Sequence, residues 1–429
     1  MLKVLKQNTR IYELLRLVMG IIRIFDFNFY NLFLVRRSRR LVLNNKTKIL
    51  LAGSVGLNPD MLMQSILGVG LKNSGADVYQ LSCDGMLPIC YQAKQFHFQS
   101  QKDQIQLARN GMGTACIACR LKSFAYGYSC DFHRLTYSKY VNEKSPRNTF
   151  LSDIDFDSVI KSSTYRSKRR YRGVAVLNHA YSAVVRFYAS NKLEDEVAAC
   201  SLLKSYCESA IITVDVMNAV LEDLISIDTV ICDHGIYVPQ GVITEFCKLK
   251  KINILTFNTG YRKNSFLFST GDSYHFAIPR DKKFLTREFS NENRKKALEY
   301  VESRKTGKND WVYFQERNQE NAIKFSQNVK RIAFFPNVLW DADIHFAEAI
   351  FENSARWIND SLKHILENSN FEVHIRIHPG EIKGFIIGEK HYPVMECQVI
   401  QLQKFINFAD IIFTEYNMKE NMRDRNSPT

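Results

Sequence analysis

The chain has 429 residues, 45% of them hydrophobic and 24% charged, which provides apolar material for two or three domains. Its formal charge of +14 favours a partner that carries phosphates or an anionic membrane surface. The ten cysteines are too sparse for a secreted disulfide scaffold, so that class is excluded and a cytoplasmic location is expected.

Residues 1–45 are predicted to form an amphipathic basic segment. Arg16, Arg23 and Asp26 interrupt its apolar run, and each would be costly in hydrocarbon. No small-residue cleavage site follows the run, which argues against a signal peptide. The segment is expected either to lie on an anionic membrane, which would place the protein at the inner face of the cytoplasmic membrane, or to pack on the protein itself.

Residues 46–290 alternate predicted strands and helices, which indicates an α/β fold. The strands are predicted at KILLAG (48–53), DVYQLSC (77–83), DTVICD (228–233) and INILTFN (252–258). The first two, with the helical pattern between them, make a βαβ unit that begins a doubly wound sheet. The stretch at about 84–170 has weak periodicity and predicts an irregular, cysteine-containing insertion.

Residues 291–330 predict a solvated linker helix and a loop. Residues 331–429 predict a second α/β domain, with strands at RIAFFPN and FEVHIRIHP and a last unit at KFINFADIIFTEYN. Because ligands of open α/β sheets bind at the carboxyl ends of strands, Arg376 is predicted to hold a phosphate and His378 to donate to phosphate or ribose, with Pro379 fixing the turn. A solvated basic strand end is the alternative. Further candidates for the same donor site are Asn337, Trp340, Asp341 and Glu381, of which Trp340 is equally compatible with a core position.

In the first domain, His234 ends a predicted strand and Gly235 permits close approach of the backbone. His234 is therefore predicted to act as acid, base or phosphate donor, or else to be a structural histidine. Asp84 follows another strand and is a candidate general base, with a turn cap as its alternative. Nearby loops add Arg262 and Lys263 as donor-binding candidates and three further candidates: Tyr237, Asp272 and His275.

Four cysteines form a candidate metal site. Cys116 and Cys119 make the one CxxC pair, and Cys83 and Cys90 precede it in the predicted insertion. Four thiolates can hold a structural zinc ion. The alternative is that these residues are small buried hydrophobes.

Seven ordered segments resemble bacterial capsule polysaccharide biosynthesis proteins of the glycosyltransferase B type: CDGMLPIC, CIAC, DHGIYVPQG, FNTGYRKNSFLFSTGDSYH, SRKTGKNDW, NVLWDA and IRIHPGE. The resemblance implies two facing Rossmann-like lobes, with a nucleotide sugar held mainly by the C-terminal lobe. An oligosaccharide or lipid-linked acceptor would be held by the N-terminal lobe. In similar sialyltransferase-like and Kdo-transferase-like enzymes the HP motif, here His378 and Pro379, contacts the nucleotide. No metal cofactor is required for such a reaction, and nucleic acid is not an expected partner.

The C-terminal sequence departs from this family, which continues after a strand like ADIIFT with a polar turn, a helix and another strand. Here the chain reads FTEYNMKENMRDRNSPT, so an incomplete C-terminal lobe is expected. The first hypothesis is a glycosyltransferase that builds surface polysaccharide. A truncated or non-catalytic assembly subunit and a nucleotide-sugar epimerase of the same architecture are the alternatives.

Overall fold

The computed structural model describes residues 47–54, 59–93, 100–142, 147–188, 193, 196–224, 226–260, 262–280, 290–306, 312–313, 330–338, 350–351, 354–369, 371–375, 385–387, 390–392 and 412–413. The chain divides into two compact units. The first contains Met1–Phe187, Leu193–Thr259 and Phe266–Arg287, and the second contains Tyr188–Lys192, Gly260–Ser265 and Glu288–Thr429. Each unit is described by itself.

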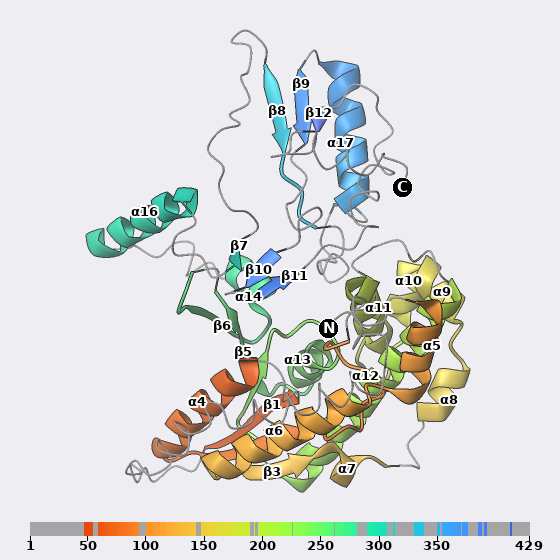
Figure 1. The fold of residues 1–429 in the computed structure, drawn as a ribbon, viewed down its shortest axis with the longest axis vertical. Coiled ribbons are helices and arrows are strands. Elements are labelled where there is room, and N and C mark those ends of the chain that lie inside the picture. The colour runs from red at the N-terminus through yellow and green to blue at the C-terminus, as the bar shows by residue number, and fades with distance from the viewer. Residues whose placement is uncertain are drawn as a thin grey trace, which may run out of the picture. The chain divides into compact units, whose positions relative to one another are not determined.

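The first unit is built on a six-stranded sheet of order β3-β2-β1-β4-β5-β6 (Figure 1). Its strands are β1 (Lys48–Ser54), β2 (Asp77–Ser82), β3 (His133–Thr136), β4 (Thr229–Asp233), β5 (Asn253–Thr259) and β6 (Phe266–Thr270). The first five are parallel, and β6 runs antiparallel to β5. This mixed, mostly parallel sheet is Rossmann-like, and its strand order reverses between β1 and β4.

Helices cover both faces of the sheet. On one face α4 (Pro59–Asn73) packs on β1, β2 and β4 beside α6 (Thr114–Cys130). On the other face α13 (Gln240–Leu249) packs on β1, β4 and β5 and is in turn covered by α12 (Glu196–Asp223) and α11 (Val176–Tyr188). The central strands are therefore buried on both sides, which explains their nearly continuous apolar sequences.

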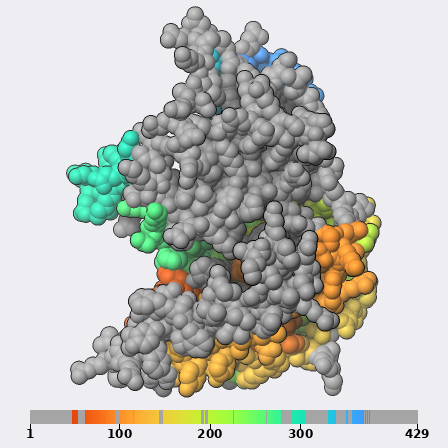
Figure 2. All heavy atoms as spheres, viewed as in Figure 1, coloured from red at the N-terminus to blue at the C-terminus, as the bar shows by residue number. Residues whose placement is uncertain are grey.

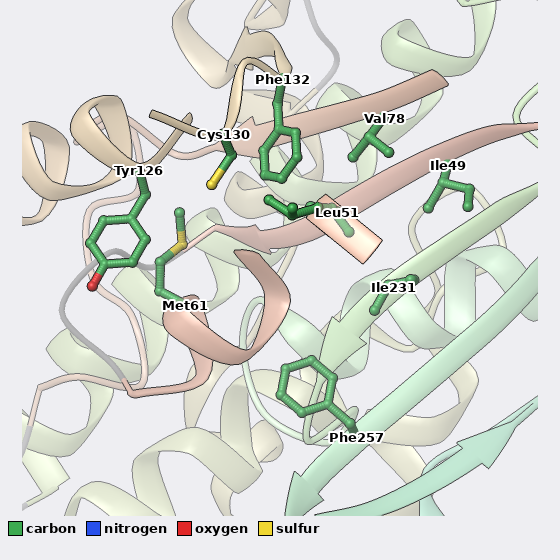
Figure 3. Packing of buried hydrophobic residues seen from close by; sticks show 10 residues of the cluster. Ile49, Leu51, Met61, Val78, Tyr126, Cys130, Phe132, Ile231 and Phe257 are labelled. Carbon is green, nitrogen blue, oxygen red and sulfur yellow. The ribbon is translucent and has the colours of Figure 1, made fainter. Parts of the chain in front are cut away.

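The core under α4 and α6 shows how the strands divide their side chains (Figure 3). Ile49 and Leu51 of β1 point to this face together with Val78, Ile231 and Phe257 from the neighbouring strands. The helices and the turn before β3 complete the cluster with Met61, Val69, Tyr126, Cys130 and Phe132. Each fully buried aliphatic side chain contributes roughly 1.5–3 kcal/mol relative to exposure, so this cluster fixes the strand register.

The stretch at 84–170 differs from the irregular insertion that its sequence predicts. Its described residues form β3 and six helices: α5 (Gln101–Asn110), α6, α7 (Tyr137–Tyr140), α8 (Arg147–Ser152), α9 (Phe156–Lys161) and α10 (Ser163–Lys168). The prediction was wrong because α7 to α10 are too short to show a helical repeat, while α6 is apolar on its outer face as well as its inner one.

Three arginines of the basic sequence at 166–172 contact other residues of the first unit. Arg166 is buried, donates to the carbonyl of Val159 at 2.6 Å and lies over the ring of Tyr181. Arg170 pairs with Glu245 at 2.8 Å, and Arg172 pairs with Asp215 at 3.0 Å. These arginines therefore join helices rather than form a free basic surface.

In the described part of the chain, one helix is long and apolar enough to span a bilayer, the Val197–Asp223 stretch of α12. Its most apolar window is 72% buried inside the structure. The packing of α12 against α5, α7, α8, α9 and α13 accounts for its composition as a core helix.

The second unit also alternates strands and helices. A parallel sheet of order β12-β9-β8 is formed by β8 (Arg331–Phe334), β9 (Glu372–Ile375) and β12 (Ile412–Phe413), with α17 (Ser354–Asn368) between the first two strands in sequence. An antiparallel sheet contains β7 (Val312–Tyr313), β10 (Phe385–Ile387) and β11 (Lys390–Tyr392), and α16 (Asn291–Thr306) precedes it. The strands predicted at 331 and 371 are thus confirmed in their described residues.

Candidate functional site

The carboxyl end of β4 carries a buried carboxylate beside the point where the strand order reverses. Asp233 is 3% exposed and accepts hydrogen bonds from Tyr91 Oη at 3.3 Å and Gln240 Nε2 at 3.1 Å. A buried carboxylate is tolerated only when donors replace its water. The loop after β2 and the start of α13 supply these donors, so three elements meet at Asp233.

The backbone after Asp233 turns sharply to reach α13. His234 and Gly235 have φ values of 57° and 78°, in the left-handed region, and the amide of His234 donates to the carbonyl of Phe257 at 2.8 Å. A Cβ on Gly235 would lie only 3.0 Å from Thr256 Cγ2 and 3.2 Å from Thr244 Oγ1. Glycine therefore allows β4, β5 and α13 to meet closely at this turn.

Aromatic rings and an arginine surround the same turn. The guanidinium of Arg186 lies 4.3 Å from the ring centre of Tyr237 and 5.7 Å from that of Tyr91, an arrangement that favours a cation. The ring of His234 lies 5.3 Å from that of Tyr237 and 5.9 Å from that of His275. We refer to these side chains as the β4-edge cluster: Tyr91, Arg186, Asp233, His234, Tyr237 and His275.

Hydrogen bonds of a buried histidine join the helices beneath the cluster. His179 of α11 contacts Glu245 of α13 at 2.8 Å through Nε2 and the carbonyl of Ile236 at 3.1 Å through Nδ1. Burial raises the pKa of Glu245, but the hydrogen bond and charge of His179, the amide of Ala175 and the charge of Arg170 lower it to about 2. Glu245 is therefore ionised at neutral pH and fixes α11, which carries Arg186, against the cluster.

Three buried polar atoms next to the turn make no hydrogen bond within the described structure: Arg186 Nη1, Gln240 Oε1 and Ser273 Oγ. Leaving a buried polar atom unsatisfied costs about 1–3 kcal/mol, and more for a charged group. A bound anion could accept from Arg186 Nη1 and Ser273 Oγ, whereas a bound hydroxyl could donate to Gln240 Oε1. The cluster thus combines an anion-binding guanidinium with a carboxylate and imidazoles that can move protons.

Two predicted residues have local partners elsewhere. Asp84 accepts from the amide of Ser138 at 3.1 Å and so holds the start of α7 rather than capping its own turn. Asp272 forms an ion pair with Lys248 of α13. Both carboxylates therefore stabilise the local fold through these contacts.

The remaining predicted donor residues belong to the second unit, and most of them lie outside the described residues. Arg262 and Lys263 are exposed in the turn between β5 and β6, which belongs to the second unit. Asn337 is exposed after β8. The other donor candidates lie outside the described residues: Trp340, Asp341, Arg376, His378, Pro379 and Glu381.

Sequence reasoning missed four contributors: Tyr91, Arg186, Asp233 and Gln240. Asp233 could have been found, because it precedes His234 at the end of the same strand. Arg186 also left a signal, as a cation in the otherwise apolar pattern of α11. The loop position of Tyr91 gave none.

The four predicted zinc ligands line one small cavity in the same unit. Cys83, Cys90, Cys116 and Cys119 surround it together with Leu87, Met112 and Ala115. Among the residues that the structure describes, no three His, Cys, Asp or Glu side chains are arranged as metal ligands. The cavity is considered further below.

Comparisons of the chain with protein-family models, with curated proteins and with solved structures find no match.

Proposed function

We propose that the protein is a glycosyltransferase that uses a nucleotide-sugar donor to extend a surface polysaccharide. The Rossmann-like sheet supplies a ligand position at its switch point, but a fold alone does not define an activity. The proposal therefore rests on the β4-edge cluster and on the ordered segments that resemble capsule polysaccharide enzymes. In that arrangement the first unit is the acceptor lobe of a two-lobed enzyme.

The observation that carries the proposal is the state of Arg186. Its guanidinium lies near the rings of Tyr237 and Tyr91, and its Nη1 atom is buried without a hydrogen-bond partner in the described structure. Guanidinium groups bind carboxylate and phosphate through paired donors. Arg186 is thus suited to an anionic group of the acceptor, either an acidic sugar or the phosphate of a lipid-linked saccharide.

His234 is the candidate base of the reaction. It is partly exposed, whereas Asp233 beside it is buried and already accepts two hydrogen bonds. In the transfer, an acceptor hydroxyl loses its proton to the imidazole and its oxygen bonds to the anomeric carbon. The bond from that carbon to the phosphate oxygen breaks, and the nucleotide leaves with the electron pair.

The outer face of α6 supports a location on an anionic membrane, where a lipid-linked acceptor would be found. Ile117, Leu121, Phe124 and Tyr128 follow helical spacing and are 46%, 43%, 58% and 62% exposed. The helix is orange in Figure 2, where its atoms reach the surface. Arg120, Lys122 and Arg134 lie on or beside it, and Arg134 is 4.2 Å from the ring of Phe124. An apolar stripe with flanking cations fits the interface of an anionic bilayer.

A donor screen tests the proposal. Purified full-length protein is heated with UDP, GDP, dTDP and CMP sugars, and nucleotide release from each is measured. One nucleotide is expected to stabilise the protein, by about 2.7 kcal/mol at one hundred times its dissociation constant. In His234→Asn the release rate should fall by about 10²–10⁴-fold while donor stabilisation persists, because asparagine tolerates the left-handed backbone.

The control is His133→Asn, which changes an exposed histidine on the edge strand β3 and should leave both readouts unchanged. Failure of every nucleotide to stabilise the folded wild type would favour the non-catalytic subunit. Isomerisation of the free nucleotide sugar without an acceptor would favour the epimerase. Arg186→Lys keeps the positive charge but loses the paired donors, whereas Arg186→Gln loses both. Inhibition of nucleotide release by glucuronate or phosphate is expected to weaken in Arg186→Lys and to weaken further in Arg186→Gln.

A further inference from the structure

The cavity lined by Cys83, Cys90, Cys116 and Cys119 joins two segments of the first unit. Cys83 directly follows β2, and Cys90 lies farther along the same loop, whereas Cys116 and Cys119 are one helical turn apart on α6. Asp84 and Gly85 have φ values of 41° and 89°, so the loop reverses immediately after Cys83. This turn brings Gly85 against α6, where its built Cβ would lie 3.9 Å from the Cβ of Cys116.

The size of the cavity selects a small occupant. Its volume is about 20 Å³, and a cavity needs roughly 10–15 Å³ of this measure to hold a single water molecule. A sugar or nucleotide does not fit. Leu87, Met112 and Ala115 contribute apolar walls, and Gln92 and Gly85 complete the lining. Four of the nine lining residues are cysteines, and thiolates bind soft cations more strongly than an amide does.

The thiols are close enough to influence one another. Burial and then the neighbouring Cys119 raise the pKa of Cys83 to about 12, and burial followed by Cys83 raises the pKa of Cys90. Burial and Cys119 likewise raise the pKa of Cys116. These mutual effects agree with the four cysteines lining one cavity, and a bound cation would favour their thiolate forms.

Other cysteines of the first unit lack this arrangement. Cys207 of α12 is fully buried in the core, and burial is the main cause of its raised pKa, with Glu208 as a minor one. Cys247 of α13 is similarly buried. They behave as small hydrophobic residues, and Cys207 provides a matched control.

We infer that Cys83, Cys90, Cys116 and Cys119 bind one zinc ion that ties the loop after β2 to α6. Four sulfur ligands in tetrahedral geometry are typical of structural zinc. The side chains must turn toward the cavity, since they are not yet arranged as ligands. As each ligand thiol becomes a thiolate, its proton passes to solvent, so binding involves no change of oxidation state.

The zinc would also position the β4-edge cluster. Tyr91 follows Cys90 directly, and its hydroxyl donates to Asp233. The backbone of this loop is anchored on α12 by Ser209 Oγ, which accepts from the amide of Ile89 at 3.1 Å. Zinc would fix the other side of the loop and hold Tyr91 at the buried carboxylate.

The test is the metal content of full-length protein purified under nitrogen without chelator. Wild type and Cys207→Ala are expected to contain one zinc per chain by mass spectrometry of the metals, and Cys116→Ala/Cys119→Ala to contain almost none. Cobalt added to the apoprotein should give the visible spectrum of a tetrahedral thiolate site, lost in the double variant. If that variant fails to fold, the single variant Cys116→Ala replaces it, because Cys116 is only half-buried. Weaker cobalt binding than in the wild type is then expected.

Two results would overturn the inference. Equal zinc in the wild type and the cysteine variants, or a wild-type apoprotein that binds neither zinc nor cobalt, would show that the cysteines only pack. A third result, iron with acid-labile sulfide in the purified protein, would show that the cysteines bind an iron–sulfur cluster instead of zinc. The metal content and the cobalt spectrum can both be measured whether or not the protein transfers sugars.

Discussion

The β4-edge cluster and the cysteine cavity lie in one unit and follow strands of one sheet, yet their chemistry is opposite. The cluster after β4 combines a carboxylate, a guanidinium and imidazoles that are drawn from strands, loops and a covering helix. The cavity after β2 is lined mainly by cysteines and apolar side chains. The edge of a parallel sheet therefore supplies only the position, and the segments that reach it determine what can bind.

The two regions also differ in what holds them in place. The cluster is already braced, because Asp233 has its donors and the pair of His179 and Glu245 joins the helices beneath it. In the described part of the chain, the four cysteines of the cavity form no disulfide with one another. The first region is organised by its own hydrogen bonds, whereas the second would be tied together by the zinc ion inferred above.

The largest effect is expected from removing the contact between Glu245 and His179 beneath the β4-edge cluster. Glu245 has an ordinary pKa of 4.5, and its pKa in the folded protein is about 2. Because the folded value is the lower one, the ionised carboxylate stabilises the fold above pH 4.5, and this contribution is lost as the pH falls toward 2. At 1.36 kcal/mol per pKa unit, Glu245→Gln should lower the free energy of unfolding at pH 7 by about 3 kcal/mol.

Urea denaturation of the wild type and Glu245→Gln at pH 7 and at pH 3 measures this effect. The difference between the two proteins should shrink at pH 3. Glu222→Gln is the control, because Glu222 is exposed and contacts only Asn218 on its own helix within the described structure. If Glu245→Gln is as stable as this control, the contact between His179 and Glu245 does not stabilise the fold.

The sequence predicted the centre of the sheet but not its edges. Strands β1 and β4 were found because they are apolar runs, most of whose residues are buried between two layers of helices. Strands β2 and β5 also bury apolar side chains, although both contain polar residues as well. Strand β3 was missed because it has four residues, two of them exposed. Short edge strands carry too little pattern to be told from loops.

The candidate site was predictable only where its signal was local. His234 was found because a strand end, a histidine and a glycine are neighbours in sequence. The role of Arg186 depends on Tyr91 and Tyr237, which approach it only in the folded chain. The cysteine spacing suggested a metal, but that the four residues share one cavity follows from a loop reversal that no spacing rule contains.

A smaller effect would connect the two regions. Tyr91→Phe removes one hydrogen bond to Asp233 and should lower stability by about 1 kcal/mol. If zinc holds the loop of Tyr91, this loss should be smaller in the Cys116→Ala/Cys119→Ala background, as a double-mutant cycle would show. Tyr165→Phe, which removes a hydrogen bond to the amide of Asp155 far along the chain, should give the same loss in both backgrounds. Equal losses for Tyr91→Phe would separate the cavity from the cluster.

The smallest effect concerns the outer face of α6, the helix whose inner face carries Cys116 and Cys119. Phe124 is 58% exposed, so Phe124→Gln removes the apolar area that it would bury in a bilayer. A loss of about 0.5–1 kcal/mol, or two- to fivefold in partitioning, is expected in flotation assays with phosphatidylglycerol vesicles. Leu298→Gln on α16 is the control, because Leu298 is 65% exposed on a helix rich in charges of both signs. If both variants partition like the wild type, α6 is not the membrane-facing surface. A deficit specific to Phe124→Gln that vanishes on phosphatidylcholine vesicles would show that its flanking arginines direct it to anionic lipid.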